Sequence, residues 1–492
     1  MISQLTPLKS LDLTVLSPYK LKNARPVMDS RKVTPGDLFL ACPGGSVDGR
    51  DYIAAALKQG AAFVLWDDAD GFAWQDEWQV PNLAVSQLAE QAGVVAAYLL
   101  GEPARALNCI GITGTNGKTS ISQWLAQALD LLGERCAVMG TVGNGFWGEL
   151  IEATHTTPDP VSIQGVIRDV VAQGAKALAM EVSSHGLAQG RVNGVTFHTA
   201  VFTNLTRDHL DYHGDMASYG AMKSRLFYWQ GLQHAVINVD DDYGAQLAAT
   251  LAEDSRNKAE VVTYGFLDEA IVKIASFEPS LDGMRIGFET PWGNGELNTA
   301  LLGRFNAQNL AACVGVLCAQ GHDLARVLAV LAHIKPATGR MDCVKLPNKP
   351  LVVVDYAHTP DALEKALTTL HEVKADDSEL WCVFGCGGNR DKGKRPLMGA
   401  VAQQFADRAV VTSDNPRLED PHSIIADILP AVPHPALVEV DRAEAIRATI
   451  ALAKPNDIVL IAGKGHETYQ DVGGQKHHFS DFEVAMNALE QK

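Results

Sequence analysis

The chain is organised around one glycine-rich stretch, Gly111-Ile112-Thr113-Gly114-Thr115-Asn116-Gly117-Lys118-Thr119-Ser120. The residues before it, 107–110, are typical of the end of a short buried strand. The residues after it, 121–132, place apolar side chains on one face of a helix. A strand, a glycine-rich turn and a helix that starts at Lys-Thr are the setting that a phosphate-binding loop needs.

The residue types of this stretch suit phosphate binding. Glycines let backbone N–H groups turn inward, and the helix N-terminus adds partial positive charge. Lys118 can reach the β- and γ-phosphates, and the Thr119 hydroxyl can ligate Mg²⁺. The general pattern G-x-x-x-x-G-K-[ST] has glycine where this chain has Ile112, so the loop is built on Gly114 instead. The alternative, a glycine-rich turn without a ligand, is disfavoured because Gly, Lys and Thr stand in register.

The length, composition and net charge of the chain limit the kinds of protein that it can be. A chain of 492 residues exceeds one typical core, which predicts roughly two to four domains. With 47% hydrophobic and 20% charged residues it has the composition of an ordinary globular protein. The net charge of −17 argues against non-specific nucleic-acid binding, so any anionic substrate needs a local basic cluster.

The cysteines and the N-terminus indicate a cellular location. The eight cysteines form no CxxC pair and no zinc-ligand spacing, and we expect reduced thiols. The first twenty residues contain no apolar core of a signal sequence, and no run of about 18 apolar residues occurs. We therefore expect a cytoplasmic protein without a membrane span.

Residues 1–102 are predicted to form a small N-terminal α/β domain. Strands are expected at 37–41 and 62–66, with a helix over 52–59 that ends before Gly60. The segments 29–31 and 43–50 bring polar and basic groups to turns, as a substrate site or as turn chemistry alone. Gly101-Glu102-Pro103 marks the expected boundary.

Residues 103–338 are predicted to form a central domain with a P-loop-type, mostly parallel sheet flanked by helices. The runs 177–182 and 199–203 are nearly all apolar, as strands buried on both faces should be. Ligands of such sheets bind beyond the carboxyl ends of the strands. Glu181 and His209 follow these strands and could ligate a divalent ion together with Thr119. A hydrogen-bonded loop histidine is the alternative for His209.

A later helix begins near Gly303. Asn306 and Asn309 are three residues apart, so they share a helix face and could both address one planar base. Capping of the helix by Asn306 is the alternative.

Residues 339–492 are predicted to form a Rossmann-like C-terminal α/β domain. Strands are expected at 351–355, 381–384, 410–412 and 457–462, each followed by polar residues. Arg390, the pair Asp414 and Arg417, and Glu467 lie on three such loops. Arginine grips a carboxylate in a bidentate manner and carboxylates hold an ammonium, which favours a zwitterionic ligand over three ordinary loops.

Taken together, these motifs resemble the Mur ligase family. The resemblance runs from about residue 29 to 470 in family order, and its motifs are Gly114–Thr119, Glu181–His185, Thr203-Asn204 with Asp208–Asp211, Phe305-Asn306 with Asn309, Asp355–Pro360 and Asp414–Arg417. It implies an ATP-dependent, ADP-forming amide ligase that uses Mg²⁺ in peptidoglycan precursor synthesis. The stretch Asp414 to Arg417 resembles the signature of the members that add meso-diaminopimelate to a UDP-muramoyl dipeptide.

The resemblance also implies residue roles. ATP is expected at Gly114, Thr115, Asn116, Gly117, Lys118, Thr119, Ser120, Asn306, Asn309 and Arg340. The UDP-muramoyl substrate is expected at Met28, Ser30, Gly45, Ser46, Val47, His155, Thr156, Thr157, Ser183, Gln189 and Arg191. The family often has Asn where this chain has His155. Diaminopimelate is expected at Arg390, Asp414, Asn415, Pro416, Arg417, Gly463 and Glu467.

The same resemblance assigns the reacting centre. The catalytic residues are expected to be Lys118, Lys223, His209, Asp355 and His358. The metal ligands are expected to be Thr119, Glu181, His209 and Lys223, the last as a carbamate. Without the resemblance, Lys223 would be interpreted as a solvated helix lysine.

Three alternatives stay open from the sequence. The first is a sister ligase that adds L-lysine, and the second is a folylpolyglutamate-type ligase. The third is an ATP-driven switch that binds nucleotide without forming an amide. We expect small-molecule substrates, no nucleic-acid partner and a monomer.

Overall fold

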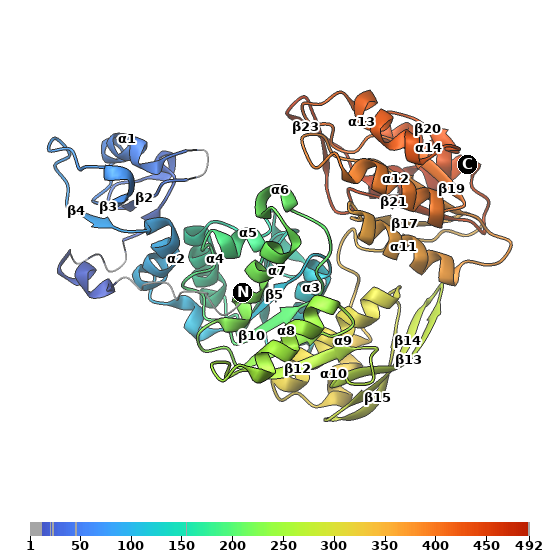
Figure 1. Cartoon of the computed structure of the whole chain (residues 1–492), viewed down its shortest axis with the longest axis horizontal. Helices are drawn as coiled ribbons and strands as arrows, with labels where there is room; N and C mark the ends of the chain where they lie inside the picture. Colours follow the sequence, from blue (N-terminus) through green and yellow to red (C-terminus); the bar gives the residue numbers. More distant parts are fainter. Residues whose placement is uncertain (1–11, 20, 22–23, 45–46, 154, 491–492) are drawn as a thin grey trace.

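The computed structural model describes residues 12–19, 21, 24–44, 47–153 and 155–490. Figure 1 shows three α/β units: a blue N-terminal unit, a central unit coloured cyan to yellow, and an orange to red C-terminal unit. Each unit has its own main sheet, and the central unit lies between the other two. The α/β architecture with mostly parallel sheets, predicted from the apolar runs, is confirmed.

The N-terminal unit contains one small parallel sheet. Its strands pair in the order β1 (Pro26–Val27), β2 (Leu38–Ala41), β3 (Phe63–Asp67) and β4 (Asn82–Val85). Helix α1 (Ile53–Lys58) covers one face and α2 (Leu88–Leu99) covers the other, because each buries an apolar stripe in a separate core.

The central sheet has a parallel middle and antiparallel edges. Its order is β15 (Gly293–Thr299), β14 (Gly283–Thr290), β13 (Val272–Ser280), β12 (Glu260–Gly265), β11 (His234–Asn238), β10 (Thr199–Phe202), β5 (Asn108–Thr113), β9 (Ala177–Glu181), β6 (Cys136–Met139), β7 (Asn144–Phe146) and β8 (Glu149–Ile151). The strands from β13 to β6 in this order run parallel, whereas the hairpins at the two edges are antiparallel.

Helices cover both faces of this sheet. Helices α3 (Lys118–Leu132), α9 (Arg304–Ala319) and α10 (Leu324–Leu331) pack on one face. Helices α4 (Pro160–Ala172) and α8 (Asp242–Glu253) pack on the other. Three short helices stand near the carboxyl ends of the strands: α5 (Ser184–Ala188), α6 (Leu210–His213) and α7 (Met216–Ser224).

The C-terminal unit has a six-stranded sheet. Its order is β16 (Asp342–Val344), β17 (Leu351–Asp355), β21 (Ile458–Ala462), β18 (Leu380–Phe384), β19 (Arg408–Val411) and β20 (Leu437–Val438), with only β16 antiparallel. Helices α11 (Pro360–Val373), α12 (Lys394–Phe405) and α13 (Pro421–Ile428) cover one face. Helices α14 (Arg442–Leu452) and α15 (Asp481–Glu490) cover the other.

Two features of the structure were not predicted. The antiparallel edges of the central sheet are one, and the hairpin of β22 (Tyr469–Val472) and β23 (Gln475–His478) is the other. Several predicted strands and helices shift by one or two residues at their ends, whereas the helix after the glycine-rich stretch begins at Lys118, as the Lys-Thr start predicted. No helix in the described ranges is long and apolar enough to cross a membrane.

Candidate active site

The phosphate loop joins β5 to α3 at the carboxyl end of the central sheet (Figure 1). Gly114 and Gly117 take positive φ angles of 143° and 88°, which residues with a side chain rarely adopt. A Cβ atom at Gly114 would collide with Thr203 Oγ1, and one at Gly117 would stand 2.6 Å from Asn309 Oδ1. Both positions therefore require glycine, whereas Ile112 lies buried within β5.

Lys118 begins α3 and folds back over the loop. Its Nζ donates hydrogen bonds to Gly114 O at 2.9 Å and to Thr115 O at 2.8 Å. Burial lowers the pKa of Lys118 from its ordinary value, and the charge of Arg340 adds to the shift while Glu181 opposes it. A bound phosphate would supply the anion that this ammonium lacks.

Glu181 lies beside Thr119 because β9 is the neighbour of β5. The glutamate is 1% exposed, and its Oε2 accepts hydrogen bonds from Thr119 Oγ1 at 3.1 Å and Thr141 Oγ1 at 2.9 Å. These oxygen donors beside the phosphate loop are of the kind that Mg²⁺ prefers. Within the described residues, no group of three His, Cys, Asp or Glu side chains could hold a metal by itself.

Lys223, on α7, is buried against the phosphate loop. It is 1% exposed, its Nζ donates to Gly114 O at 2.8 Å, and it lies 4.4 Å from the centre of the Tyr219 ring. Burial holds the pKa of Lys223 well below its ordinary value, and the charge of Lys118 adds to the shift. The neutral amine is the form that can react with CO₂, and the carbamate stays a prediction.

Asp208 and His209 follow β10, on the loop before α6. His209 has a φ of 54°, and its Nε2 lies 3.4 Å from Asp208 Oδ2. Burial alone would raise the pKa of Asp208, but the charges of His209, His358 and Lys394 lower it below its usual value. Burial lowers the pKa of His209, so its ring is neutral at pH 7 and can act as a ligand.

A pocket of about 230 Å³ adjoins the phosphate loop on the side of α9. It is lined from the central unit by Asn116, Gly117, Ser120, Thr203, Asn204, Asn238, Asp240, Asp241, Phe305, Gln308 and Asn309. The C-terminal unit contributes Arg340, Asp355, Ala362 and Lys365. Its position beside the phosphate loop suits the base and ribose of a nucleotide, as predicted for Asn309 and Arg340, and this assignment stays a prediction.

The two asparagines of α9 have different places. Asn309 lines this pocket, but Asn306 does not. Asn306 Nδ2 donates to Leu302 O at 2.7 Å, and its Oδ1 accepts from Asn309 Nδ2 at 3.2 Å. Asn306 therefore holds Asn309, and Gly303 occupies the cap position. Gln308 lines the pocket instead and donates to Asp240 Oδ2 at 2.6 Å; neither residue was singled out from the sequence.

Arg340, Asp355 and His358 reach the site from the C-terminal unit. Asp355 Oδ2 accepts from Met341 N at 2.7 Å, and burial raises the pKa of this carboxyl. The Arg340 guanidinium lies 4.6 Å from the centre of the Tyr356 ring. Burial lowers the pKa of His358 to about 4, so its ring is uncharged at pH 7.

A cavity of about 770 Å³ lies between the central and C-terminal units. The central unit lines it with Thr141, Val142, Leu150, Glu152, Ala153, His155, Thr156, His185, Asp208, His209 and Asp211. Thr338 lines it at the end of the central unit, and the C-terminal unit lines it with Tyr356, His358, Gly385, Cys386, Gly387, Arg390, Asp391, Lys394, Asp414, Asn415, Arg417, Gly463, His466, Glu467, Thr468 and Tyr469. The loops after two separate sheets thus face each other across one space.

The Asp414-to-Arg417 loop is held by its surroundings. Arg417 has a φ of 53°, its N–H donates to Asp471 O at 2.9 Å, and its Nη1 donates to Gly388 O at 2.8 Å. Arg417, Asp414 and Gly463 line the cavity together with the exposed Arg390. Pro416 is buried and does not line it, so its part is to shape the loop.

The central-unit residues expected to bind the acceptor form one hydrogen-bonded group. Thr157 Oγ1 donates to Glu181 O and accepts from Ser183 N, both at 3.0 Å. Arg191 Nη1 donates to Thr157 O at 2.7 Å, and its Nε donates to Gln189 Oε1 at 2.9 Å. The group is therefore tied to Glu181 and hence to the phosphate loop.

The other residues expected to bind the acceptor are spread over two units. His155 and Thr156 line the large cavity. Met28, Ser30 and Val47 belong to the N-terminal unit, where Ser30 is buried and Val47 is exposed. Gly45 and Ser46 lie outside the described residues.

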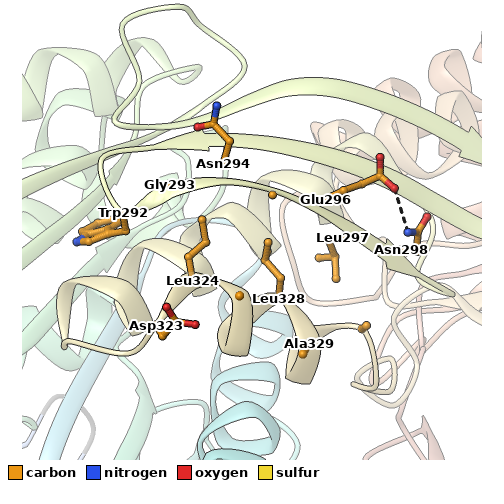
Figure 2. Close-up of a pocket in the computed structure, with 13 residues that line it drawn as sticks. Trp292, Gly293, Asn294, Glu296, Leu297, Asn298, Asp323, Leu324, Leu328 and Ala329 are labelled. Atoms are coloured by element: carbon orange, nitrogen blue, oxygen red, sulfur yellow. Dashed lines mark hydrogen bonds between the residues drawn. The ribbon is translucent and has the colours of Figure 1, made fainter.

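A second hollow lies away from this site. It measures about 520 Å³ and runs between the edge strand β15 and α10, with Leu297, Leu324 and Leu328 on its wall (Figure 2). Its carboxylates are engaged: Glu296 pairs with Arg285 at 2.8 Å, and Asp323 caps α10. None of the residues that line it also lines the pocket at the phosphate loop or the large cavity.

Comparisons with known protein families match most of the chain. Residues 27–98 match "Mur ligase family, catalytic domain", residues 112–317 match "Mur ligase middle domain", and residues 339–465 match "Mur ligase, glutamate ligase domain". These ranges follow the three sheets in order.

Curated relatives extend the likeness to the full length. A protein of Neisseria meningitidis serogroup A named UDP-N-acetylmuramoyl-L-alanyl-D-glutamate–2,6-diaminopimelate ligase is 62% identical over 489 residues, which are 99% of each chain. A protein of the same name from Pseudomonas aeruginosa is 50% identical over 467 residues, covering 94% of each.

Solved structures share the fold. One entitled with the same ligase name has a TM-score of 0.69 and 38% identity, covering 94% of both chains. The MurF ligase of Thermotoga maritima in complex with ADP has a TM-score of 0.65 over 96% of this chain and 98% of its own, and at 19% identity it supports the fold alone.

Proposed function

The chain belongs to the Mur ligase family, and we propose that it joins meso-2,6-diaminopimelate to UDP-N-acetylmuramoyl-L-alanyl-D-glutamate with cleavage of ATP to ADP and phosphate. The family resemblance drawn from the motifs is thereby confirmed. The activity is that of an ATP-dependent carbon–nitrogen ligase of peptidoglycan precursor synthesis.

The observation that carries the proposal is the cavity between the central and C-terminal units. On one side it meets His209 and Asp208, next to the phosphate loop, and on the other it meets Arg417 and Glu467. A carboxyl group activated by phosphate and an amino acid held by charged side chains would thus meet in one space. An ATP-driven switch that forms no amide would not need the charged side chains of Arg417 and Glu467 at this cavity.

The first step is phosphoryl transfer. The D-glutamate side-chain carboxylate attacks the γ-phosphorus of ATP, the bond to the β-phosphate oxygen breaks, and ADP leaves from the acyl-phosphate. Lys118 leaves the carbonyls of Gly114 and Thr115 and neutralises charge on the phosphates. Magnesium, when bound by Thr119, Glu181, His209 and a carbamate on Lys223, would supply further positive charge there.

The second step is amide formation. The amine of diaminopimelate attacks the acyl carbon, the C–O bond to phosphate breaks, and the proton of the amine leaves with phosphate. Asp355 and His358 approach the nucleotide from the C-terminal unit and are proposed to complete the site when the units close. Because closure excludes water, the acyl-phosphate is spared from hydrolysis.

The choice of amino acid is proposed to lie in the loops of the C-terminal unit. The distal centre of diaminopimelate carries an ammonium and a carboxylate, whereas the end of a lysine side chain carries only an ammonium. Arg417, with Arg390 beside it, would grip the carboxylate, and Asp414 and Glu467 would hold the ammonium. Lysine would leave an arginine unpaired, which disfavours it.

The remaining assignments are part of the same proposal. Residues 1–102 bind the UDP-muramoyl end, residues 103–338 bind ATP, and residues 339–492 bind the amino acid. The cysteines within the described ranges are free, as in proteins of a reducing compartment, which supports a cytoplasmic enzyme.

ADP formation tests the proposal directly. The purified chain with ATP and Mg²⁺ should release ADP only when the UDP-muramoyl dipeptide and diaminopimelate are both present, and mass spectrometry should find the tripeptide product. ADP release at an equal rate without any amino acid would refute a ligase. Equal kcat/KM for lysine and diaminopimelate would refute the choice of amino acid.

A further inference from the structure

We propose that Lys464 is a positioning residue that sets the preference for diaminopimelate, an inference that rests on the proposed function. Lys464 follows β21, and its side chain is fully buried, with 0% of it exposed. It does not line the cavity and was not singled out from the sequence. Its influence on the amino acid therefore passes through Asn415 and Glu467.

The contacts of Lys464 tie two cavity loops together. Its Nζ donates to Glu467 Oε2 at 2.7 Å and to Asn415 Oδ1 at 3.0 Å. Asn415 Nδ2 donates to the same Glu467 Oε2 at 2.8 Å. A triangle of three side chains thus joins the loop after β19 to the loop after β21.

The amide of Asn415 is occupied by the protein itself. Its Oδ1 accepts from Lys464 Nζ and also from Asp471 N at 2.9 Å, and its Nδ2 is engaged with Glu467. Asn415 is 3% exposed. The side chain of Asn415 therefore chiefly connects Lys464, Glu467 and the hairpin of β22 and β23 through hydrogen bonds.

The triangle orients Glu467. Its side chain is 17% exposed and lines the cavity. Both donors bind Oε2, whereas Oε1 carries no hydrogen bond within the part of the chain that the structure describes. Lys464 and Asn415 thus hold one carboxylate oxygen inside the protein and leave the other for the ammonium of the distal amino-acid centre.

The buried ammonium of Lys464 also affects the net charge around the distal end of the amino acid. On the C-terminal wall of the cavity, Arg390, Lys394 and Arg417, with Lys464 buried behind them, stand against Asp391, Asp414 and Glu467, so that on this wall cations exceed carboxylates by one. A zwitterionic distal centre suits this balance, whereas the net positive end of lysine suits it less. Burying an ammonium is costly unless it is fully paired, so a charge kept here points to a use.

The test compares Lys464→Met and Lys464→Gln with Lys454→Met, an exposed lysine of the same unit. KM and kcat are measured separately for diaminopimelate, lysine, ATP and the UDP-muramoyl dipeptide. For Lys464→Met we expect KM for diaminopimelate to rise about tenfold or more, because charge-assisted hydrogen bonds are lost. KM for ATP and for the dipeptide should stay unchanged, and preference over lysine should fall.

Lys464→Gln keeps a donor without the charge. It should therefore restore part of the KM for diaminopimelate but little of the preference over lysine. Lys454→Met should behave as the unaltered chain. If KM for diaminopimelate does not change, or if KM rises equally for diaminopimelate, ATP and the dipeptide, Lys464 is a structural residue only and the inference fails.

A double-variant cycle keeps the test valid if Lys464→Met is poorly folded. Lys464→Gln and Glu467→Gln are made alone and together, and KM for diaminopimelate is compared. Since Lys464 acts through Glu467, adding Lys464→Gln to Glu467→Gln should raise KM little further. Independent, multiplying effects would overturn the inference. Loss of ADP formation in the unaltered chain would instead overturn the proposed function.

Discussion

Asn116 Nδ2 in the phosphate loop donates a 2.9 Å hydrogen bond to Asp361 Oδ2 at the start of α11, across the border between the central and C-terminal units. The two residues are 245 positions apart. Lys365 Nζ also donates to Asp361 Oδ2 at 3.0 Å. A loop expected to hold phosphates is thus linked directly to the unit expected to hold the amino acid. We therefore expect occupation of the loop by nucleotide and the position of the C-terminal unit to be coupled.

Replacement of Asp361 by alanine should weaken this coupling. Because one interdomain hydrogen bond is lost, we expect kcat/KM for ATP to fall about tenfold. The free energy of unfolding should change little, since the bond is only partly buried. Steady-state ADP release and urea unfolding measure the two quantities. Asp361→Asn, which keeps an acceptor for Asn116, is the control, and wild-type kinetics in the alanine variant would contradict the coupling.

Lys223 should depend on dissolved CO₂. Its amine is buried beside Gly114 O, and its pKa lies well below the ordinary value, so the neutral form needed for carbamate formation is available. Removing bicarbonate should lower activity reversibly, and the intact mass should show a labile carboxyl adduct. Lys223→Ala should lose about a hundredfold in kcat because a charged group is lost at the phosphates. Full activity of that variant would remove Lys223 from the mechanism.

Most of the site could be predicted because its residues follow strands. Glu181 and Asp355 end apolar strands, His209 and Arg417 lie on the loops that follow two others, and the carboxyl ends of parallel strands share one edge. That rule is independent of the details of packing. The rule predicted which polar side chains lie near one another, and the cavity between the central and C-terminal units is lined by many of them.

The residues that were missed depend on contacts that no local pattern reveals. Lys464 lies in a loop rich in glycine, and only its burial between Asn415 and Glu467 shows that it pairs with them. Asn306 was expected at the base because it shares a helix face with Asn309, but Leu302 O takes its amide. The antiparallel edge strands lack long apolar runs because one side of each is exposed, so they carry a weak signal.

Acid should destabilise the chain through three partly buried histidines. Burial lowers the pKa of His185, His358 and His466 to about 4, from an ordinary value of about 6.5. Between these two values the unfolded chain binds more protons than the folded chain. The stability is therefore full above about pH 6.5 and falls as the pH drops towards about 4.

The measurement is the free energy of unfolding in urea at several values between about pH 7 and about pH 5, above the range where ordinary carboxyls titrate. His466→Gln should flatten the decline, because one shifted group is removed. The raised pKa of Asp355 acts in the opposite direction in both proteins, so it cancels in the difference. Parallel curves for the variant and the unaltered chain would exclude His466 as a cause.

Arg417 should decide between diaminopimelate and lysine. It lines the cavity, its backbone has a φ of 53°, and its Nη1 is already held by Gly388 O at 2.8 Å. The rest of the guanidinium is therefore aimed by the protein before any ligand binds. Arg417→Ala should raise KM for diaminopimelate on the order of a hundredfold, because a bidentate partner of its distal carboxylate is lost. KM for lysine should change far less.

Two further variants separate charge from geometry at this position. Arg417→Lys keeps the charge without the planar fork, so it should recover only a small part of the loss. Arg408→Lys, an exposed arginine that pairs with Glu379 at 2.9 Å, is the matched control and should leave every KM unchanged. Competition between diaminopimelate and lysine, read by mass spectrometry of the product, gives the ratio of kcat/KM directly. An unchanged ratio in Arg417→Ala would show that the distal carboxylate is recognised elsewhere, with the exposed Arg390 as the next residue to replace.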